Sequence, residues 1–233
     1  MGKLTSSGKR RAAEAALLEV KDGQVLGIGT GSTVEIFIRL LGERVRKEGI
    51  KVTGVATSYQ SAYLAAENGI QLTTLDEHPR LDLAVDGTDE LDPDLNLIKG
   101  GGAALTREKI VDSSAARFVV IADSSKYVER LGSKVAVPIE VLPMARATVM
   151  KRIRILGGEP KVRDGGDRKD GPLVTDNGNF IVDANFGKIP DARTLEFELK
   201  RIPGIVEVGL FINMAHTALL GDESGVRRMD RKR

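Results

Sequence analysis

The chain has 233 residues, of which 41% are hydrophobic and 29% charged, and its formal net charge at pH 7 is only +2. This balance gives no reason to expect nucleic acid as a partner, and the length allows one large domain or two modest ones. Cysteine is absent, which excludes disulfides, a thiolate nucleophile and zinc sites that use sulfur. No apolar stretch approaches the ~20 residues that span a bilayer, and residues 1–9 lack the apolar core of a signal peptide. We therefore expect a cytoplasmic protein with no membrane partner.

Helical and strand-like patterns alternate through the first half of the chain. The expected helices are 10–20, 34–47, 61–68 and 103–115, and the expected strands are 24–29, 51–57, 81–86 and 117–123. Such alternation is typical of α/β proteins and predicts a doubly wound, mostly parallel Rossmann-like sheet. Ligands of such sheets bind beyond the carboxyl ends of the strands.

The pattern changes from about Val135 onward. Strands are expected over 135–142, 160–163, 179–186 and 205–211, with helices over 145–156 and 191–202. Two successive strand–helix–strand units predict a smaller ferredoxin-like α+β domain. We expect residues 1–131 and 208–233 to form the Rossmann-like catalytic domain, and residues 132–207 to form the small split βαβ domain and to take part in oligomer contacts.

Three local features carry their own expectations. Pro138 argues for an edge position of the strand 135–142, because proline cannot donate to a central ladder. The polar turn 164–172 is expected to be disordered. The basic end 227–233 is expected to be a solvated, frayed terminus, with a tail that binds phosphate polymers as the alternative.

The segment "GIGTGST", Gly27–Thr33, invites a dinucleotide-binding interpretation that fails on inspection. Its third glycine would fall on Ser32 or Val34, no acid ends the next strand, and a Walker loop would need a lysine. What remains is a strand-to-helix turn whose backbone N–H groups and hydroxyls, from Thr30, Ser32 and Thr33, suit a single phosphate. A tight turn with Ser32 or Thr33 as helix cap is the compatible alternative.

The segment 86–102, "DGTDELDPDLNLIKGGG", gathers five carboxylates, one lysine and three successive glycines. An EF-hand that began at Asp92 would need glycine at Leu97 and glutamate at Ala103, so a calcium loop is not indicated. His78 and His216 stand in no ligand motif. We therefore expect a site without a bound metal, and we interpret Asp92 and Asp94 as a solvated turn.

The other charged residues of this region stand where ligands bind. Asp86 ends a predicted strand, and Lys99 precedes glycines that let the backbone approach a ligand closely. Glu108 lies a few residues into the next helix, and Lys126 follows the strand 117–123.

Five segments in order carry a family resemblance: "GIGTGST", "DGTDE", "KGGGAALTREKIV", "ADSSK" and "VTDNGNF". Together they resemble the successive signatures of the type A ribose-5-phosphate isomerase family and span most of the chain. The resemblance implies an aldose–ketose isomerase that interconverts D-ribose 5-phosphate and D-ribulose 5-phosphate through an ene-diolate, in the non-oxidative pentose phosphate pathway. It also implies no cofactor and a homodimer or homotetramer. Thr88 stands where bacterial members often have alanine, and the segment 214–229 departs more from the familiar pattern.

The resemblance also assigns roles to residues. Glu108 matches the catalytic base, Lys99 the cation that stabilises the oxyanion, Asp86 the group for ring opening, and Asp89 a partner of sugar hydroxyls. The implied substrate contacts are Thr30, Gly31, Ser32, Thr33, Asp86, Gly87, Thr88, Asp89, Lys99, Gly100, Gly101, Gly102, Lys126 and, as a further phosphate partner, Lys9.

Two other functions remain open at this point. A related isomerase-deaminase for amino sugar phosphates would need a differently placed acid–base set, usually with a catalytic histidine. A non-catalytic sugar-phosphate sensor domain would keep the phosphate anchor without needing Lys99 or Glu108.

Overall fold

The computed structural model describes residues 2–167 and 169–232. The chain forms two compact units. The first consists of Met1–Thr88, Arg107–Lys126 and Met214–Arg233, and the second of Asp89–Thr106 and Tyr127–Asn213. The domain boundaries expected from the sequence stay a prediction, and the compact units differ from them chiefly in giving residues 89–106 to the second unit.

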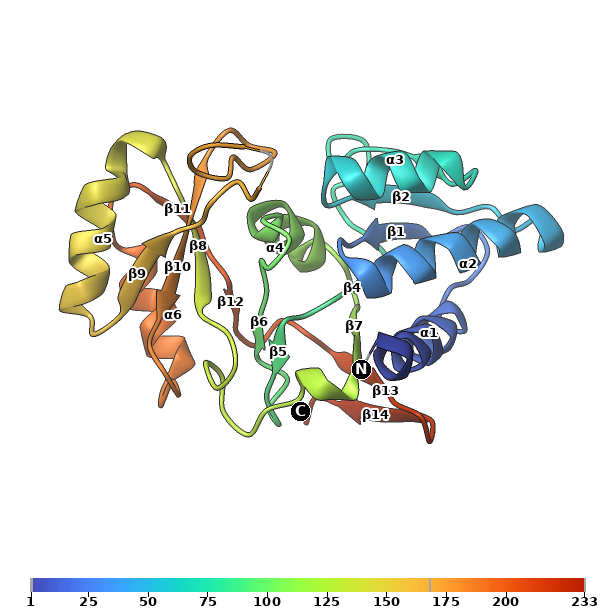
Figure 1. Ribbon diagram of the computed structural model, residues 1–233. Coiled ribbons are helices and arrows are strands. Elements are labelled where there is room, and N and C mark those ends of the chain that lie inside the picture. The colour runs from blue at the N-terminus through green and yellow to red at the C-terminus, as the bar shows by residue number, and fades with distance from the viewer. Residues whose placement is uncertain (1, 168, 233) are drawn as a thin grey trace. The chain divides into compact units, whose positions relative to one another are not determined.

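The first unit is built on a seven-stranded sheet with the order β14-β13-β7-β4-β1-β2-β3 (Figure 1). Its strands are β1 (Val25–Ile28), β2 (Thr53–Ala56), β3 (Gln71–Leu72), β4 (Leu83–Asp86), β7 (Phe118–Asp123), β13 (Thr217–Gly221) and β14 (Val226–Asp230). Every pairing is parallel except that of β14 with β13. From β1 the chain adds β2 and β3 on one side of that strand, and then adds β4, β7 and β13 on its other side. The carboxyl ends of β1 and β4 therefore flank the topological switch point.

Helices cover both faces of this sheet, so the predicted doubly wound architecture is confirmed. The helices are α1 (Gly2–Leu17), α2 (Ser32–Glu48), α3 (Tyr59–Glu67) and α4 (Leu105–Ser113). The helices α1 and α2 lie side by side (Figure 1) and bury Ala16 and Phe37 against strand residues such as Val85. On the other face, Val111 of α4 packs against Val55 and Leu81.

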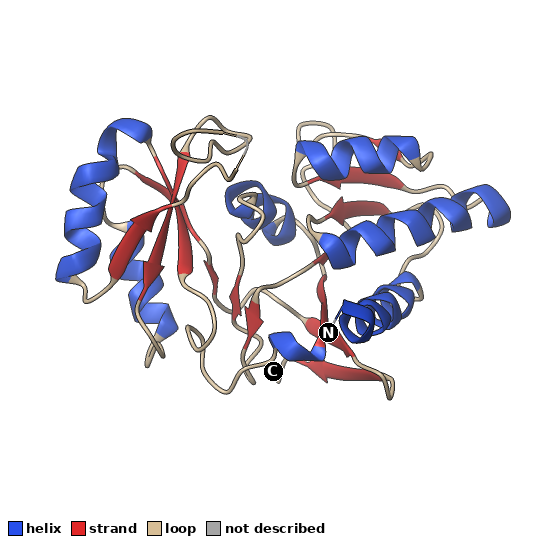
Figure 2. Cartoon of the chain, in the orientation of Figure 1, coloured by secondary structure: helices blue, strands red, loops and turns tan. Residues whose placement is uncertain are grey.

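The second unit contains a four-stranded antiparallel sheet with the order β11-β8-β10-β9. Its elements are β8 (Val137–Val141), α5 (Arg146–Ile155), β9 (Glu159–Val162), β10 (Phe180–Asn185), α6 (Ala192–Lys200) and β11 (Ile205–Val208). Counted along the chain, the strands stand fourth, first, third, second, which is the predicted ferredoxin-like arrangement. Figure 2 draws both helices beside this sheet. They contribute to a core that includes Val149 and Leu199, and Asp191 caps α6.

The second unit also holds a small sheet with the order β12-β6-β5, formed by Leu210–Phe211, Leu97–Ile98 and Glu90–Leu91. Two single helical turns complete the described structure, η1 (Ser124–Lys126) in the first unit and η2 (Pro143–Ala145) in the second. Among the described residues, none of the helices is both long and apolar enough to cross a membrane.

The expected edge position of Pro138 is wrong, because β8 lies between β11 and β10. The ladder with β11 pairs only residues 139–141 of β8, so the missing N–H of Pro138 falls just beyond it. Its carbonyl accepts the N–H of Gly209 at 2.7 Å. At Gly209 the single strand expected over 205–211 divides into β11 and β12, which join different sheets.

The expectation of a frayed C-terminus over 227–233 is also wrong for residues 227–230, and residue 233 lies outside the described residues. Residues 227–230 belong to β14, which pairs in register with β13, and Arg228 donates a hydrogen bond to Glu19 at 2.7 Å. In the turn 164–172, the N–H of Gly165 donates to the carbonyl of Gly171 at 2.9 Å, so the described part is a closed loop instead of a disordered one. Residue 168 of that turn lies outside the described residues.

Candidate active site

Asp86 ends β4 at the switch point, and its side chain is completely buried. Its Oδ1 accepts the N–H of Thr30 at 3.0 Å and the N–H of Gly87 at 2.6 Å. A Cβ at position 29 would lie 2.1 Å from the same oxygen, so only glycine fits there. The predicted glycine turn and the first predicted carboxylate are therefore brought into direct contact.

The glycine turn leads into α2 without a side-chain cap. Gly31 is the N-cap residue with a φ of 113°, and neither Ser32 nor Thr33 caps the helix. Instead, the Ser32 hydroxyl is exposed and accepts a hydrogen bond from Nζ of Lys9 at 3.0 Å, whereas Thr33 is buried. An ammonium and a hydroxyl beside the first turn of a 17-residue helix form a site whose chemistry suits an anion.

The hydroxyl of Thr30 is engaged inside the unit. Its Oγ1 lies 2.7 Å from Oγ1 of Thr57 and 2.8 Å from Oγ of Ser58, which also caps α3 through Ser61. Sequence reasoning missed Thr57 and Ser58. The available signal was their position directly after β2, at the carboxyl end of a strand next to β1.

The first turn of α4 carries Glu108, which is only 5% exposed. Lys109 and Asp112 of the same helix are also buried. Buried charged residues are rare and often lie at functional sites, so these three side chains make α4 a candidate source of acid–base groups.

Lys126 ends η1, directly after β7, and is half-buried.

In the second unit Lys99 follows β6 and is 2% exposed. Its backbone N–H donates to the carbonyl of Gly209 at 2.9 Å, and its ammonium lies 5.5 Å from the centroid of the Phe211 ring. The next residues form the glycine turn, in which Gly100 has a φ of 110° and the N–H of Gly101 donates to Oδ2 of Asp89 at 2.7 Å. The structure thus brings Asp89 and the triple glycine together.

Glu90 and Asp92, two further carboxylates of the segment 86–102, have structural partners. Glu90 is fully buried and accepts the N–H groups of Gly132 at 2.6 Å and Val135 at 2.9 Å. Asp92 accepts the N–H of Asn96 at 2.8 Å and holds the expected turn, although it is half-buried and burial raises its pKa.

Neither histidine stands in a catalytic arrangement. His216 accepts the N–H of Phe118 on Nδ1 at 3.0 Å, and burial lowers its pKa. The N–H of His78 donates to the carbonyl of Thr74 within its own loop. Within the described part of the chain, no group of three or more His, Cys, Asp or Glu residues is placed to hold a metal ion.

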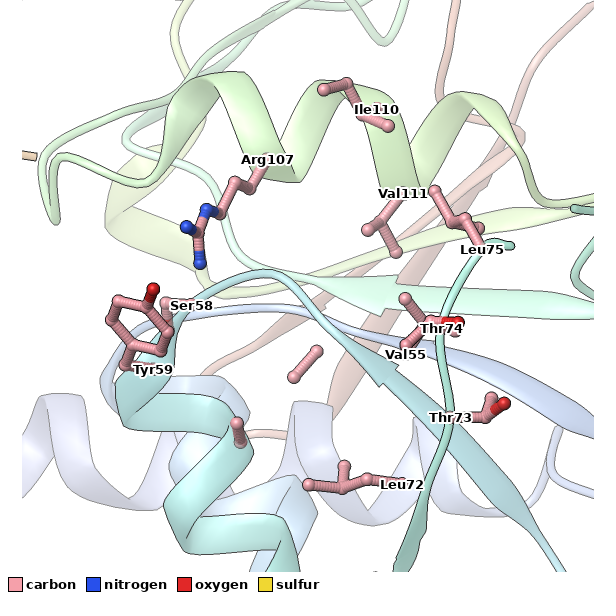
Figure 3. Close-up of a pocket in the computed structure, with 12 residues that line it drawn as sticks. Val55, Ser58, Tyr59, Leu72, Thr73, Thr74, Leu75, Arg107, Ile110 and Val111 are labelled. Atoms are coloured by element: carbon pink, nitrogen blue, oxygen red, sulfur yellow. The ribbon is translucent and has the colours of Figure 1, made fainter. Parts of the chain in front are cut away.

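A separate pocket of about 330 Å³ lies in the first unit between α3, α4 and the β2–β3 edge of the sheet (Figure 3). The guanidinium of Arg107 stands 4.7 Å from the centroid of the Tyr59 ring at its rim, and residues such as Val55, Leu72 and Val111 line it. Its described lining residues include no carboxylate, so this pocket lacks the groups that proton transfer requires.

A family model described as ribose 5-phosphate isomerase A (phosphoriboisomerase A) matches residues 53–225. The chain belongs to this family. The ribose 5-phosphate isomerase A of Methanothermobacter thermautotrophicus is 54% identical over 219 residues, which are 94% of this chain and 96% of the relative. That of Pyrococcus abyssi is 49% identical over 224 residues, 96% and 97% of the two chains.

Solved structures of ribose 5-phosphate isomerases share the fold. The enzyme from Methanocaldococcus jannaschii has a TM-score of 0.91 at 47% identity and covers 95% of this chain and 97% of its own. A D-ribose-5-phosphate isomerase in complex with phospho-erythronic acid has a TM-score of 0.95 at 45% identity and covers 97% and 99%. The predicted family and fold class are confirmed, and the similarity supports the isomerase over the isomerase-deaminase or the sensor domain.

Proposed function

We infer that this protein is an aldose–ketose isomerase that interconverts D-ribose 5-phosphate and D-ribulose 5-phosphate. The observation that carries this inference is identity of about half the residues to ribose 5-phosphate isomerases over nearly the whole chain. The solved relative that binds phospho-erythronic acid adds a chemical argument. This ligand joins a phosphate to a carboxylate, and a planar pair of carboxylate oxygens resembles the ene-diolate of the isomerisation.

Glu108 is assigned the role of base. It removes the proton from C2 of the open-chain aldose, the C–H electron pair forms the C1–C2 double bond, and the carbonyl electrons move onto O1. Return of the proton to C1, with transfer of the hydroxyl proton from O2 to O1, leaves the ketone at C2. A carboxylate that is only 5% exposed suits this role, because it is shielded from competing water.

Lys99 is assigned the stabilisation of the negative charge that forms on the oxygens during this transfer. The ammonium is buried against an aromatic ring, and a charge in such surroundings interacts more strongly with a developing oxyanion than one in water. Asp86 is assigned to ring opening, and Asp89 to the sugar hydroxyls.

The phosphate is assigned to the turn at the start of α2. Residues 31–33 offer backbone N–H groups, Ser32 adds an exposed hydroxyl, and the contact between Lys9 and Ser32 places a cation beside them. The contacts of Gly87, Thr88, Lys126 and the glycines 100–102 with the sugar belong to the same proposal. For Thr30 the assignment rests on the family resemblance alone, because its N–H binds Asp86 and its hydroxyl binds Thr57 and Ser58.

The proposal also covers the oligomeric state and the cellular location of the enzyme. Family resemblance favours a homodimer or a homotetramer in the cytoplasm, with the small domain 132–207 contributing to subunit contacts. Light scattering on the purified protein distinguishes these assemblies from a monomer.

The proposed reaction is tested with purified protein and ribose 5-phosphate, with ribulose 5-phosphate measured as it forms. We expect ketose formation that persists in the presence of a chelator. Absence of ketose would contradict the proposal, whereas release of ammonia from an amino sugar phosphate would favour the isomerase-deaminase.

A further inference from the structure

The carbonyl groups of the glycine turn are held by an arginine that no sequence motif singled out. Arg163 follows β9, and its Nη1 donates to the carbonyl of Gly100 at 2.8 Å and to that of Gly101 at 3.0 Å. Its Nε donates to Oδ2 of Asp183 at 2.8 Å, and its Nη2 donates to Oδ1 of the same residue. One planar guanidinium thus spans two consecutive peptide carbonyls and one carboxylate.

This guanidinium is itself held in place on the four-stranded sheet. The N–H of Arg163 donates to the carbonyl of Ile181 and its carbonyl accepts the N–H of Leu173, both at 2.9 Å. Asp183 belongs to β10, where it pairs with Lys161 and Pro138 on the neighbouring strands. The Arg163 side chain is 17% exposed, so few alternative positions are open to it. All of these residues belong to the second unit.

The two hydrogen bonds help to fix which way the peptides of the turn face, together with the N–H of Ala103, which donates to the carbonyl of Gly100 at 3.0 Å. In a trans peptide the carbonyl and the N–H point in opposite directions, and the described chain contains no cis peptide bond. With both carbonyls directed at Arg163, the N–H groups of Gly101 and Gly102 are directed away from it. The N–H of Gly101 confirms this direction, because it meets Asp89 at 2.7 Å.

We propose that Arg163, oriented by Asp183, is a positioning residue that aims the N–H of Gly102, in the Gly100–Gly102 turn, at the ene-diolate oxygen, while the N–H of Gly101 holds Asp89. This inference rests on the proposed function for the identity of the anion, but the holding of the turn is independent of it. The arginine also withdraws electron density from both carbonyls, which makes the N–H groups of the same peptides better donors. It acts through the turn and does not touch the substrate.

The informative substitution is Arg163→Lys. Lysine keeps the positive charge, but its single ammonium lacks the planar set of N–H donors that binds two carbonyls and a carboxylate at once. We expect kcat for ribose 5-phosphate to fall between about 10-fold and 100-fold, the range for a slightly misplaced oxyanion donor. We expect KM to change less than about threefold, since the contact strengthens only as charge develops. The inhibition constant of phospho-erythronic acid should rise by a factor similar to the loss in kcat/KM. Asp183→Asn should show the same pattern in weaker form.

A matched control is Arg201→Lys, in the exposed pair with Glu198 of the same unit, which should leave both constants unchanged. Hydrogen exchange of residues 99–103, measured by mass spectrometry without ligand, tests the holding of the turn separately from activity. Faster exchange in Arg163→Lys, with the protection of α5 and α6 retained, is the expected result. Unchanged exchange in this segment would overturn the proposal, even if the wild-type protein proved inactive on ribose 5-phosphate.

With an active wild type, unchanged kcat and unchanged inhibition by phospho-erythronic acid in Arg163→Lys would overturn the proposal and leave the proposed function standing. A parallel fall of kcat, of substrate affinity and of the protection of α5 and α6 would assign Arg163 a role in general stability instead.

Discussion

Burial of a charged residue does not by itself mark a catalytic group in this protein. Glu90 and Asp86 are both fully buried and only four residues apart, yet their surroundings differ. Glu90 accepts backbone N–H groups of the loop 132–135, and this pattern of contacts indicates a structural role in holding that loop. Asp86 binds the glycine turn at the switch point, where a Rossmann-like sheet binds its ligands. The position in the fold, and not the burial, separates the two roles.

At the residue scale, Lys99→Met tests the charge that we assign to the oxyanion. Methionine keeps an unbranched stem against Phe211 but removes the ammonium. We expect kcat to fall by about 100-fold or more while KM stays within about threefold, because the partner charge exists mainly in the transition state. Steady-state kinetics measure both constants. Lys161→Met on the exposed side of β9 is the control, and a higher KM at normal kcat would contradict the assigned role.

At the element scale, Glu19 ties the segment after α1 to two strands of the large sheet. It accepts hydrogen bonds at 2.7 Å from Arg117, which precedes β7, and from Arg228 in β14. The hydrogen bond from Arg117 lowers the pKa of Glu19, burial opposes this effect, and Arg228 reinforces it. A carboxyl group whose pKa is lower in the folded state stabilises the fold above its unfolded pKa of ~4.3 and loses this effect as pH falls through its folded value.

Glu19→Gln should therefore reduce the free energy of unfolding by about 1 kcal/mol at pH 7. The difference from wild type should shrink as the pH is lowered from about 5 to 3. Urea unfolding at several pH values measures this difference. Glu14→Gln, in the exposed pair with Arg10, should cost less than about 0.5 kcal/mol. If the difference in unfolding free energy between Glu19→Gln and wild type does not vary with pH, the proposed stabilisation by the ion pairs of Glu19 with Arg117 and Arg228 is contradicted.

The helices and strands that could be predicted from the sequence are those whose hydrophobic residues recur at the spacing of a helix or a strand. Helices such as α2 and strands such as β7 were predicted within a few residues. The two-residue strands β3, β5 and β6 could not be predicted, because pairing partners and not local pattern define so short a strand. The strand β14 was mistaken for a loose end because its exposed residues are charged, and its stability comes from β13 and from Glu19.

At the scale of the whole molecule, the fold class and the family could be predicted because several motifs occur in a fixed order along one chain. The partners of the site residues could not, because they lie far away in sequence. Arg163 is 63 residues from Gly100, and Ser58 is 28 residues from Thr30. Neither carries a motif of its own, and only the pairing of strands places them beside the predicted residues.

The base is the central claim, and Glu108→Gln tests it most directly. Glutamine keeps the size of the side chain but cannot take a proton from C2. We expect kcat to fall between about 100-fold and 10,000-fold, while the affinity for phospho-erythronic acid and the far-ultraviolet circular dichroism stay close to wild type. Glu43→Gln, in an exposed pair on α2, should keep full activity. Turnover of Glu108→Gln near the wild-type rate would contradict the account.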